Sequence, residues 1–178
     1  MSGEIGKSSD IKSGVIGAFN LELDCWRKNS HQTSTGDVTG FARYAPTGRG
    51  LVGKGMSVSG AIFTFPSTGL WEITACVGYY SMQRQNFIQT NIKTCTDGSS
   101  YDVAGLMYTG MSDGAGTNMN DHTTQTVYFG VADTSTHKCK FHWNFQTGTV
   151  TFRGDTVPDT RFLFKKLSPS PNVWQGGA

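Results

Sequence analysis

The segment from residue 61 to residue 80 constrains the fold of this chain more than any other. After Gly69, apolar side chains recur at every second position: Trp71, Ile73, Ala75, Val77 and Tyr79. A period of two predicts a long β-strand with one buried face. Pro66 cannot donate to a β-ladder, so it ends the strand before it, and Gly69 gives the turn its conformational freedom. The segment therefore predicts two strands of a β-sandwich joined by a tight turn.

Length and composition agree with a single β domain. The chain has 178 residues, enough to bury a real core, and 23 of them are glycine. Only 16% of residues are charged, which is below the usual quarter and suits short strands joined by turns. The net charge is +2 and the largest basic cluster is Lys165-Lys166, so the composition does not favour a nucleic-acid partner.

Two further features bear on the compartment. No apolar run approaches the roughly 20 residues of a membrane-spanning helix, and residues 1–10 lack the apolar core of a signal peptide. We therefore expect no membrane partner and synthesis in the cytoplasm. The four cysteines, Cys25, Cys76, Cys95 and Cys139, form no CxxC pair. Without a secretion signal, free and mostly buried thiols are expected.

Along the chain, the pattern predicts one β domain, residues 15–167, between a polar N-terminal arm, residues 1–14, and a proline-interrupted C-terminal tail, residues 168–178. The predicted strands cover residues 15–21, 61–65, 70–80, 86–94, 101–109, 123–132, 138–145, 149–152 and 160–167. Residues 38–44 and 51–52 are weaker candidates in a stretch, 20–55, that the pattern does not resolve. Residues 110–122 are predicted to form a long flexible loop. No segment shows helical periodicity.

The hairpin from Phe63 to Ile73 resembles a known family. Its phenylalanines, Pro66, Gly69 and the aromatic Trp71 are similar to a hairpin of the tumour necrosis factor and complement-head jelly rolls. Residues 161–167 look like the last core strand of that family, and residues 15–19 look like its first. The resemblance, over roughly residues 15–167, implies an all-β, antiparallel β-sandwich of jelly-roll topology. It also implies a homotrimer, in which an aromatic-rich sheet edge packs against two neighbours.

The same order of predicted strands and turns is similar to jelly-roll modules of tailed bacteriophages, especially marine ones. The shared features are the Ser-Thr-Gly-aromatic turn and the hairpin at Asp97–Asp102. Those modules serve as capsid decoration proteins and as tail-fibre heads. The resemblance therefore implies a virion protein.

Three residues close together in the sequence are candidate metal ligands: His137, Cys139 and His142. His137 and Cys139 would share one face of a strand and His142 would lie on the other, which does not suit a tetrahedral site. A core cysteine with two surface histidines is the preferred interpretation. The aspartates Asp97, Asp102, Asp113 and Asp121 lack EF-hand spacing and stand where turns favour aspartate.

No motif in the sequence indicates catalysis. His31, His122, His137 and His142 allow chance pairs with the cysteines, but none is marked as an activated Cys–His pair. The sequence contains no P-loop, nucleophile elbow or HExxH motif. We therefore expect no catalytic residue, no cofactor site and no metal site.

Three other groups could carry binding. Arg153-Gly154-Asp155 is an integrin-type tripeptide on a predicted turn, where such residues also occur by chance. A sugar-stacking platform could be formed by Trp71, Tyr79, Phe129, Trp143 and Phe164, although their spacing favours core packing. Four tyrosines fall out of phase with the core and are candidates for a subunit interface: Tyr80, Tyr101, Tyr108 and Tyr128.

The leading hypothesis is a non-enzymatic virion structural protein: a homotrimeric capsid decoration, or cement, protein that stabilises a phage shell. Its partners would be copies of itself and the major capsid protein or other virion proteins, reached through residues 2–13 and 168–178. It would be made in the host cytoplasm and located in the virion. The alternative is the receptor-binding head of a tail fibre or other appendage, which would grip host glycans or proteins through residues 110–122 and the tyrosines. A cytokine-like secreted ligand is less favoured, and an enzyme least.

Overall fold

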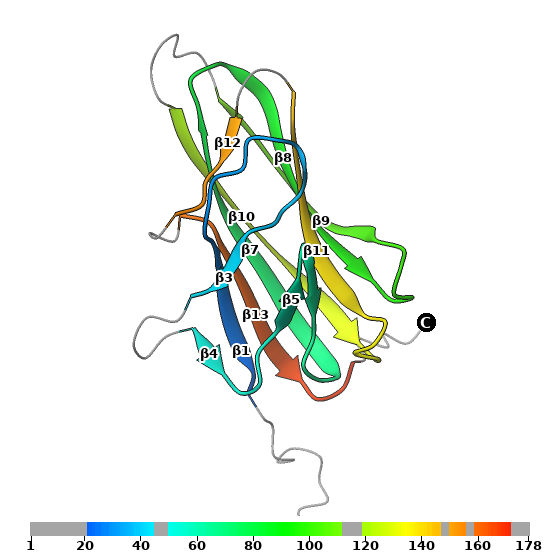
Figure 1. Cartoon of the computed structure of the whole chain (residues 1–178). Helices are drawn as coiled ribbons and strands as arrows, with labels where there is room; N and C mark the ends of the chain where they lie inside the picture. The colour runs from blue at the N-terminus through cyan, green and yellow to red at the C-terminus, as the bar shows by residue number, and fades with distance from the viewer. Residues whose placement is uncertain (1–20, 45–49, 112–118, 147–149, 156–158, 172–178) are drawn as a thin grey trace, which may run out of the picture.

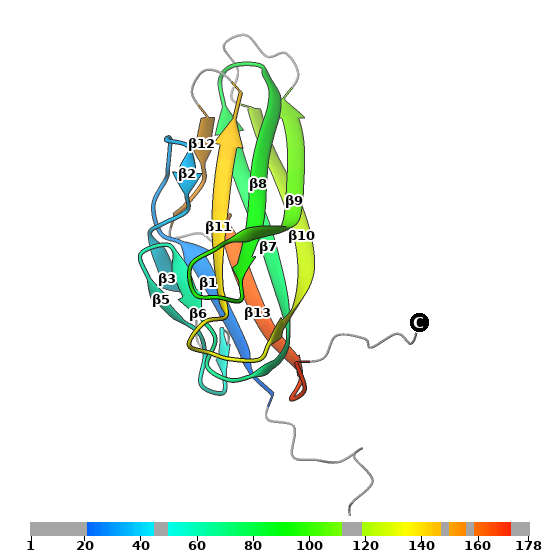
Figure 2. The same ribbon diagram turned by 90° about the vertical axis from the view of Figure 1, so that its right-hand side faces the viewer.

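The computed structural model describes residues 21–44, 50–111, 119–146, 150–155 and 159–171. Over these residues the protein is all-β, and two antiparallel sheets stack as an elongated sandwich (Figures 1 and 2). Within the described ranges, no helix is long and apolar enough to span a membrane.

Sheet A has seven strands, and its main path runs in the order β10-β7-β13-β1-β3. These strands are β10 (Met119–Val131), β7 (Gly69–Ser81), β13 (Arg161–Ser168), β1 (Leu23–Lys28) and β3 (Phe41–Arg43). Two short strands complete the sheet: β12 (Val150–Phe152) pairs with β7, and β4 (Leu51–Val52) pairs with β1. The last described strand, β13, therefore lies between β1, the first described strand, and β7.

Sheet B has six strands, and its main path runs in the order β5-β6-β11-β8-β9. These strands are β5 (Ser57–Ser59), β6 (Ile62–Thr64), β11 (Lys138–Phe145), β8 (Gln85–Cys95) and β9 (Asp102–Met111). The short strand β2 (Gly36–Asp37) pairs with β11. Successive strands cross repeatedly between the two sheets, as in a jelly roll, so the predicted fold class is confirmed.

Aromatic side chains fill the space between the sheets. Phe141 of sheet B meets Phe162 of sheet A with ring centroids 4.2 Å apart, and Phe63 contacts both Phe141 and Phe164. The five alternating positions predicted from residue 71 to residue 79 are each at most 1% exposed. Each large buried side chain contributes about 1.5–3 kcal/mol by leaving water, so this layer holds the sheets together.

The start of the fold differs from the prediction. The predicted strand 15–21 lies almost wholly outside the described residues, and Leu21 precedes the first strand. β1 instead occupies residues to which the sequence pattern assigned no strand. The pattern missed this strand because Asp24 interrupts the apolar alternation on its buried face. Asp24 is 1% exposed and accepts hydrogen bonds from Trp26 Nε1 and the Met56 amide, both at 2.8 Å. Arg43 adds an ion pair at 3.0 Å, so the buried carboxylate is fully paired.

The predicted loop at residues 110–122 is wrong at both ends. β9 extends to Met111 and β10 begins at Met119, while residues 112–118 lie outside the described part. The polar start of β10 is a strand because β7 is long enough to pair with all of it, from Met119 opposite Ser81 onward. Backbone pairing with a long neighbour outweighs the polar composition here.

The predicted boundaries between arms and domain remain predictions. Residues 1–14 and 172–178 lie outside the described part, while β13 ends at Ser168, where the predicted tail begins.

Candidate functional site

The outward face of sheet A, which we call the sheet A face, is the first candidate site. Opposed residues in antiparallel strands point to the same side. Four of them form an uncharged row across the middle of this face: Cys25, Leu163, Thr74 and Thr126. The Thr74 and Thr126 hydroxyls are hydrogen-bonded at 2.7 Å, which uses their polar groups within the sheet.

Charges on the sheet A face lie outside that row. Lys165 and Glu72 face each other in the register of β13 and β7, and Tyr128 follows them on β10. On the other side of the row, Arg27 donates to the backbone oxygen of Asp155 at 2.5 Å. Tyr128 is 59% exposed. A broad sheet face with a neutral centre and an exposed tyrosine suits contact with another protein surface.

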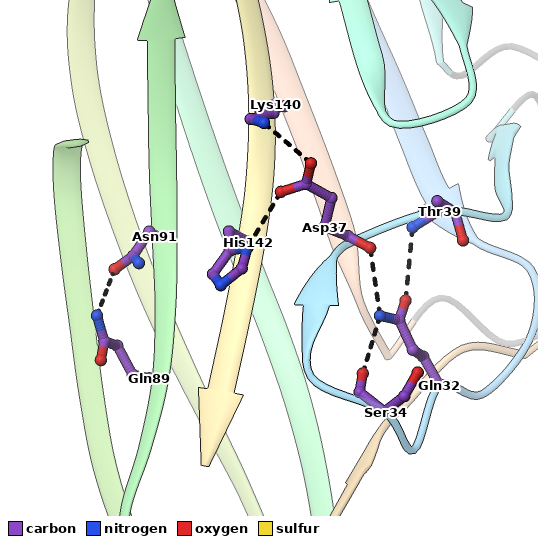
Figure 3. A network of polar contacts seen from close by, with 8 residues as sticks. All are labelled: Gln32, Ser34, Asp37, Thr39, Gln89, Asn91, Lys140 and His142. Carbon is purple, nitrogen blue, oxygen red and sulfur yellow. Dashed lines mark hydrogen bonds and ion pairs between the residues drawn. The ribbon is translucent and has the colours of Figure 1, made fainter. Parts of the chain in front are cut away.

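The outward face of sheet B, which we call the sheet B face, carries a polar network (Figure 3). Asp37 accepts hydrogen bonds from Lys140 Nζ at 2.9 Å and from His142 Nδ1 at 3.0 Å. Partial burial opposes ionisation of Asp37, but the hydrogen bonds and charges of Lys140 and His142 outweigh it and lower the Asp37 pKa. These two contacts fasten β2 to β11.

A glutamine holds the loop that carries Asp37. Gln32 Nε2 donates to the backbone oxygens of Ser34 and Asp37 at 3.1 and 3.3 Å, and Gln32 Oε1 accepts from the Thr39 amide at 3.5 Å. Figure 3 shows this clamp beside β11, with the Gln89–Asn91 amide pair on β8. The network therefore fixes a loop against the sheet.

Aromatic side chains border the sheet B face. Tyr108 is 59% exposed and meets Phe87 edge to face, with ring centroids 6.3 Å apart. Lys140 Nζ lies 4.4 Å from the centroid of the Tyr101 ring. The four tyrosines predicted to fall out of phase with the core are not among the buried core residues. Their role in a subunit interface stays a prediction.

The candidate metal ligands are separated. Cys139 is fully buried in the core, and burial raises the pKa of its thiol. His142 points outward to Asp37, while the His137 ring packs 5.7 Å from Phe129. Among the described residues, no group of three or more His, Cys, Asp or Glu side chains could hold a metal ion.

Of the aspartates predicted to lie in turns, Asp97 does and Asp121 does not. Asp97 Oδ1 accepts hydrogen bonds from the Ser99 and Ser100 amides at 2.8 and 2.7 Å, and these bonds lower the pKa of Asp97. Asp121 instead lies within β10 and accepts a hydrogen bond from the Thr109 hydroxyl, so its assignment to a turn is wrong. Asp113 lies outside the described residues.

The four cysteines are free thiols. Cys95 and Cys139 are buried, whereas Cys25 and Cys76 are half-buried on the sheet A face. In the described part of the chain, no histidine is hydrogen-bonded to any of them.

The Arg153-Gly154-Asp155 tripeptide is tied down. Arg153 pairs with Asp159 at 2.8 Å. A Cβ atom on Gly154 would stand 2.2 Å from the Ser30 backbone oxygen, so this glycine is packed against the segment around Ser30. The five aromatic side chains considered as a sugar-stacking platform are all buried in the core, which bears out the prediction of core packing.

A buried polar cluster near the start of β1 was not predicted. Lys166 Nζ donates to Ser67 Oγ at 2.7 Å, and Ser67 Oγ donates to Glu22 Oε1 at 2.5 Å. Ser67 therefore accepts a hydrogen bond from Lys166. In a serine nucleophile activated by a lysine base, the serine hydroxyl would instead donate to the lysine, so this cluster does not have the catalytic arrangement. The sequence signal for this cluster was Lys166, because a charged residue at an inward position of a strand needs a buried partner.

Comparison with known proteins gives a fold. No protein-family model and no curated protein matches this sequence. Among solved structures, Eiger TNF from S. frugiperda matches with a TM-score of 0.64 and 7% identity, over 88% of this chain and 98% of that chain. Murine APRIL at pH 5.0 matches with a TM-score of 0.57 and 9% identity, over 83% of this chain and 99% of that chain.

The fold is a tumour necrosis factor-like jelly roll. At such low identity the likeness concerns the fold alone.

Proposed function

We propose that this protein is a non-enzymatic structural protein of a bacteriophage virion, a homotrimer that decorates the capsid. The observation that carries the proposal is the uncharged row across the sheet A face, from Cys25 to Thr126. A row of this kind loses little hydration when another protein surface covers it, because none of its four side chains carries a charge.

The mechanism would be burial of surface across several joints at once. Each copy would contact two others through the sheet A face and the neighbouring strand edge, with Tyr128 at the contact. Residues 2–13 and 168–178 would contact the major capsid protein. Linked weak contacts raise the overall affinity through a high effective concentration, so a trimer would resist detachment better than a single copy.

A second candidate function is the receptor-binding head of a tail fibre or other virion appendage. The observation that favours it is the mixed character of the sheet B face, where the exposed Tyr108 stands beside the Gln89–Asn91 amide pair. Exposed aromatic rings next to amides are typical of surfaces that recognise a ligand.

Native mass spectrometry of the purified chain tests the proposal first. A mass of three chains is expected, and a strict monomer at micromolar concentration would contradict it. Phage shells mixed with the full chain and with a variant lacking residues 2–13 then test attachment. The full chain should bind and the truncated chain should not, with unchanged circular dichroism as the control for folding. Binding to host cells but not to shells would favour the second candidate.

A further inference from the structure

A polar pocket of about 430 Å³ lies at one end of the sheet A face, where β7, β10 and β12 meet the chain before β2. It is lined by His31, Tyr80, Asn120, Thr151 and Arg153. Its volume falls in the range of pockets that bind small ligands, roughly 300–1,000 Å³. We propose that this pocket binds a hexose unit of a glycan. The inference rests on the second candidate function and gives it a site on sheet A, separate from the surface around Tyr108 on the sheet B face.

Strand register brings the lining residues together. Tyr80 lies opposite Thr151 in the pairing of β12 with β7, and opposite Asn120 in the pairing of β10 with β7. These three side chains therefore form a row. Gln32 and Phe152 exchange two backbone hydrogen bonds, at 3.0 and 2.9 Å, which places His31 beside Arg153. Four separate segments thus converge on one pocket.

The pocket wall is held in place by the protein itself. The Arg153 guanidinium donates to Asn120 Oδ1 at 3.0 Å and pairs with Asp159 at 2.8 Å. The Arg153 amide donates to the Gly78 oxygen at 2.9 Å. Gly154 lets its backbone approach Ser30 more closely than any residue with a Cβ atom could. A preformed wall of this kind lowers the entropy that a ligand has to lose on binding.

Hydrogen-bond donors predominate in the pocket. The Gly154 amide donates to His31 Nδ1 at 3.0 Å, so that nitrogen carries no proton and the ring proton is on Nε2, where it is a donor. Asn120 uses its oxygen for Arg153 and keeps its NH₂ group as a donor. The guanidinium has five N–H donors, and its contacts with Asn120 and Asp159 use two of them. A ligand for this wall therefore needs several oxygen acceptors close together, as a sugar has.

The charge balance favours a neutral sugar over a small anion. Asp159 offsets the charge of Arg153, and the hydrogen bond accepted by His31 requires a neutral ring. A phosphate dianion would therefore meet little net positive charge. The Thr151 hydroxyl, which lines the pocket, can accept from a sugar hydroxyl, and the Tyr80 ring in the same lining can contact sugar C–H groups. The donors, the acceptor and the ring together match a hexose.

Saturation-transfer NMR on the full chain tests the proposal. Glucose, galactose, mannose, N-acetylglucosamine and glucuronic acid are the sugar probes, and inorganic phosphate is the ion probe. At least one sugar should bind saturably at millimolar concentration. Asn120→Ala and His31→Ala, both at exposed positions, should each weaken that binding at least tenfold. Ser59→Ala, an alanine change at an exposed position of β5, should leave it unchanged.

Several outcomes would overturn the proposal: no saturable sugar binding, equal binding by the wild type and Asn120→Ala, or phosphate binding at lower concentration than every sugar. The same samples, analysed by native mass spectrometry and host-cell adhesion, separate it from the proposed functions. Sugar binding by a monomer would support the pocket and contradict the trimer. Sugar binding without adhesion to cells would support the pocket and remove the receptor-head function.

Discussion

Tyr128 and Tyr108 show how differently the two faces of this sandwich are built. Each is 59% exposed, and each lies on a strand at one edge of its sheet. Tyr128 stands opposite Glu72 at the border of the uncharged row on the sheet A face. Tyr108 stands opposite Gln89 on the sheet B face, which also carries the ion-paired network around Asp37. Equal exposure therefore does not mean equal availability for protein contact, because the neighbours decide how much hydration must be lost.

A charge introduced into the neutral row should have the largest effect. Leu163→Glu places a carboxylate in the centre of the sheet A face, and burying it in a subunit contact would cost several kcal/mol. We expect this variant to be monomeric by native mass spectrometry. Asn144→Glu on the sheet B face is the matched control and should keep the trimer mass. Equal masses for the two variants would remove the distinction between the faces.

Two lysines, one partly exposed and one buried, differ in how they affect stability as pH changes. Lys140 pairs with a carboxylate, whereas Lys28 is 2% exposed and donates to the Thr39 backbone oxygen at 2.7 Å. Burial lowers the pKa of Lys28 to about 8. Between pH 8 and 10.5 the unfolded chain therefore holds the proton that the folded chain has released, so this lysine makes the folded state more stable as pH rises.

Urea unfolding of the wild type and of Lys28→Met at several pH values isolates this effect. The difference in unfolding free energy should grow by roughly 3 kcal/mol in favour of the wild type between pH 7 and 10.5. Subtraction is needed because burial raises the thiol pKa values of Cys25 and Cys139, which lowers stability at high pH in both proteins. A pH-independent difference would mean that Lys28 keeps an ordinary pKa.

The matched tyrosines give a smaller and more direct test. Tyr128→Ala should weaken self-association by about 1–2 kcal/mol per contact, since tyrosines at interfaces often contribute this much. Tyr108→Ala should leave self-association unchanged. Analytical ultracentrifugation over a concentration series measures both. A larger effect from Tyr108 would place the subunit contact on the sheet B face.

The smallest effect is expected for Asp37→Asn. The carboxylate is partly exposed, so its bonds to Lys140 and His142 should be worth no more than about 1 kcal/mol at neutral pH. Because the Asp37 pKa is lowered, this contribution is present above the ordinary aspartate pKa and is lost as pH falls below it. Thermal melts at pH 7 and pH 3 should differ less in the variant than in the wild type.

How well the sequence predicted the fold depended on how each strand satisfies its polar groups. β11 was predicted with its observed bounds because apolar and polar residues alternate along its whole length. β1 was missed because Asp24 and Lys28 occupy inward positions and find their partners on distant parts of the chain. A periodicity argument sees only neighbours along the sequence, so such tertiary pairing lies beyond it.

The same limit applies to the candidate sites. The tyrosines were correctly placed out of phase with the core, since that needs only a period of two. The polar pocket could not be predicted, because it depends on the register that sets Tyr80 between Thr151 and Asn120. The Arg153-Gly154-Asp155 motif was visible in the sequence, but its role in that wall requires the contacts with His31 and Asp159.

The pairing of β1 with β13 gives the molecule a direction. Leu23 lies opposite Lys165, so the first strand begins and the last strand finishes at one pole of the sandwich, while Tyr80 and Asn120 lie at the other. A particle that held this chain by both of its ends would therefore point the opposite pole outward. Tethering and recognition would then occupy different ends of one sandwich, and each could change without disturbing the other.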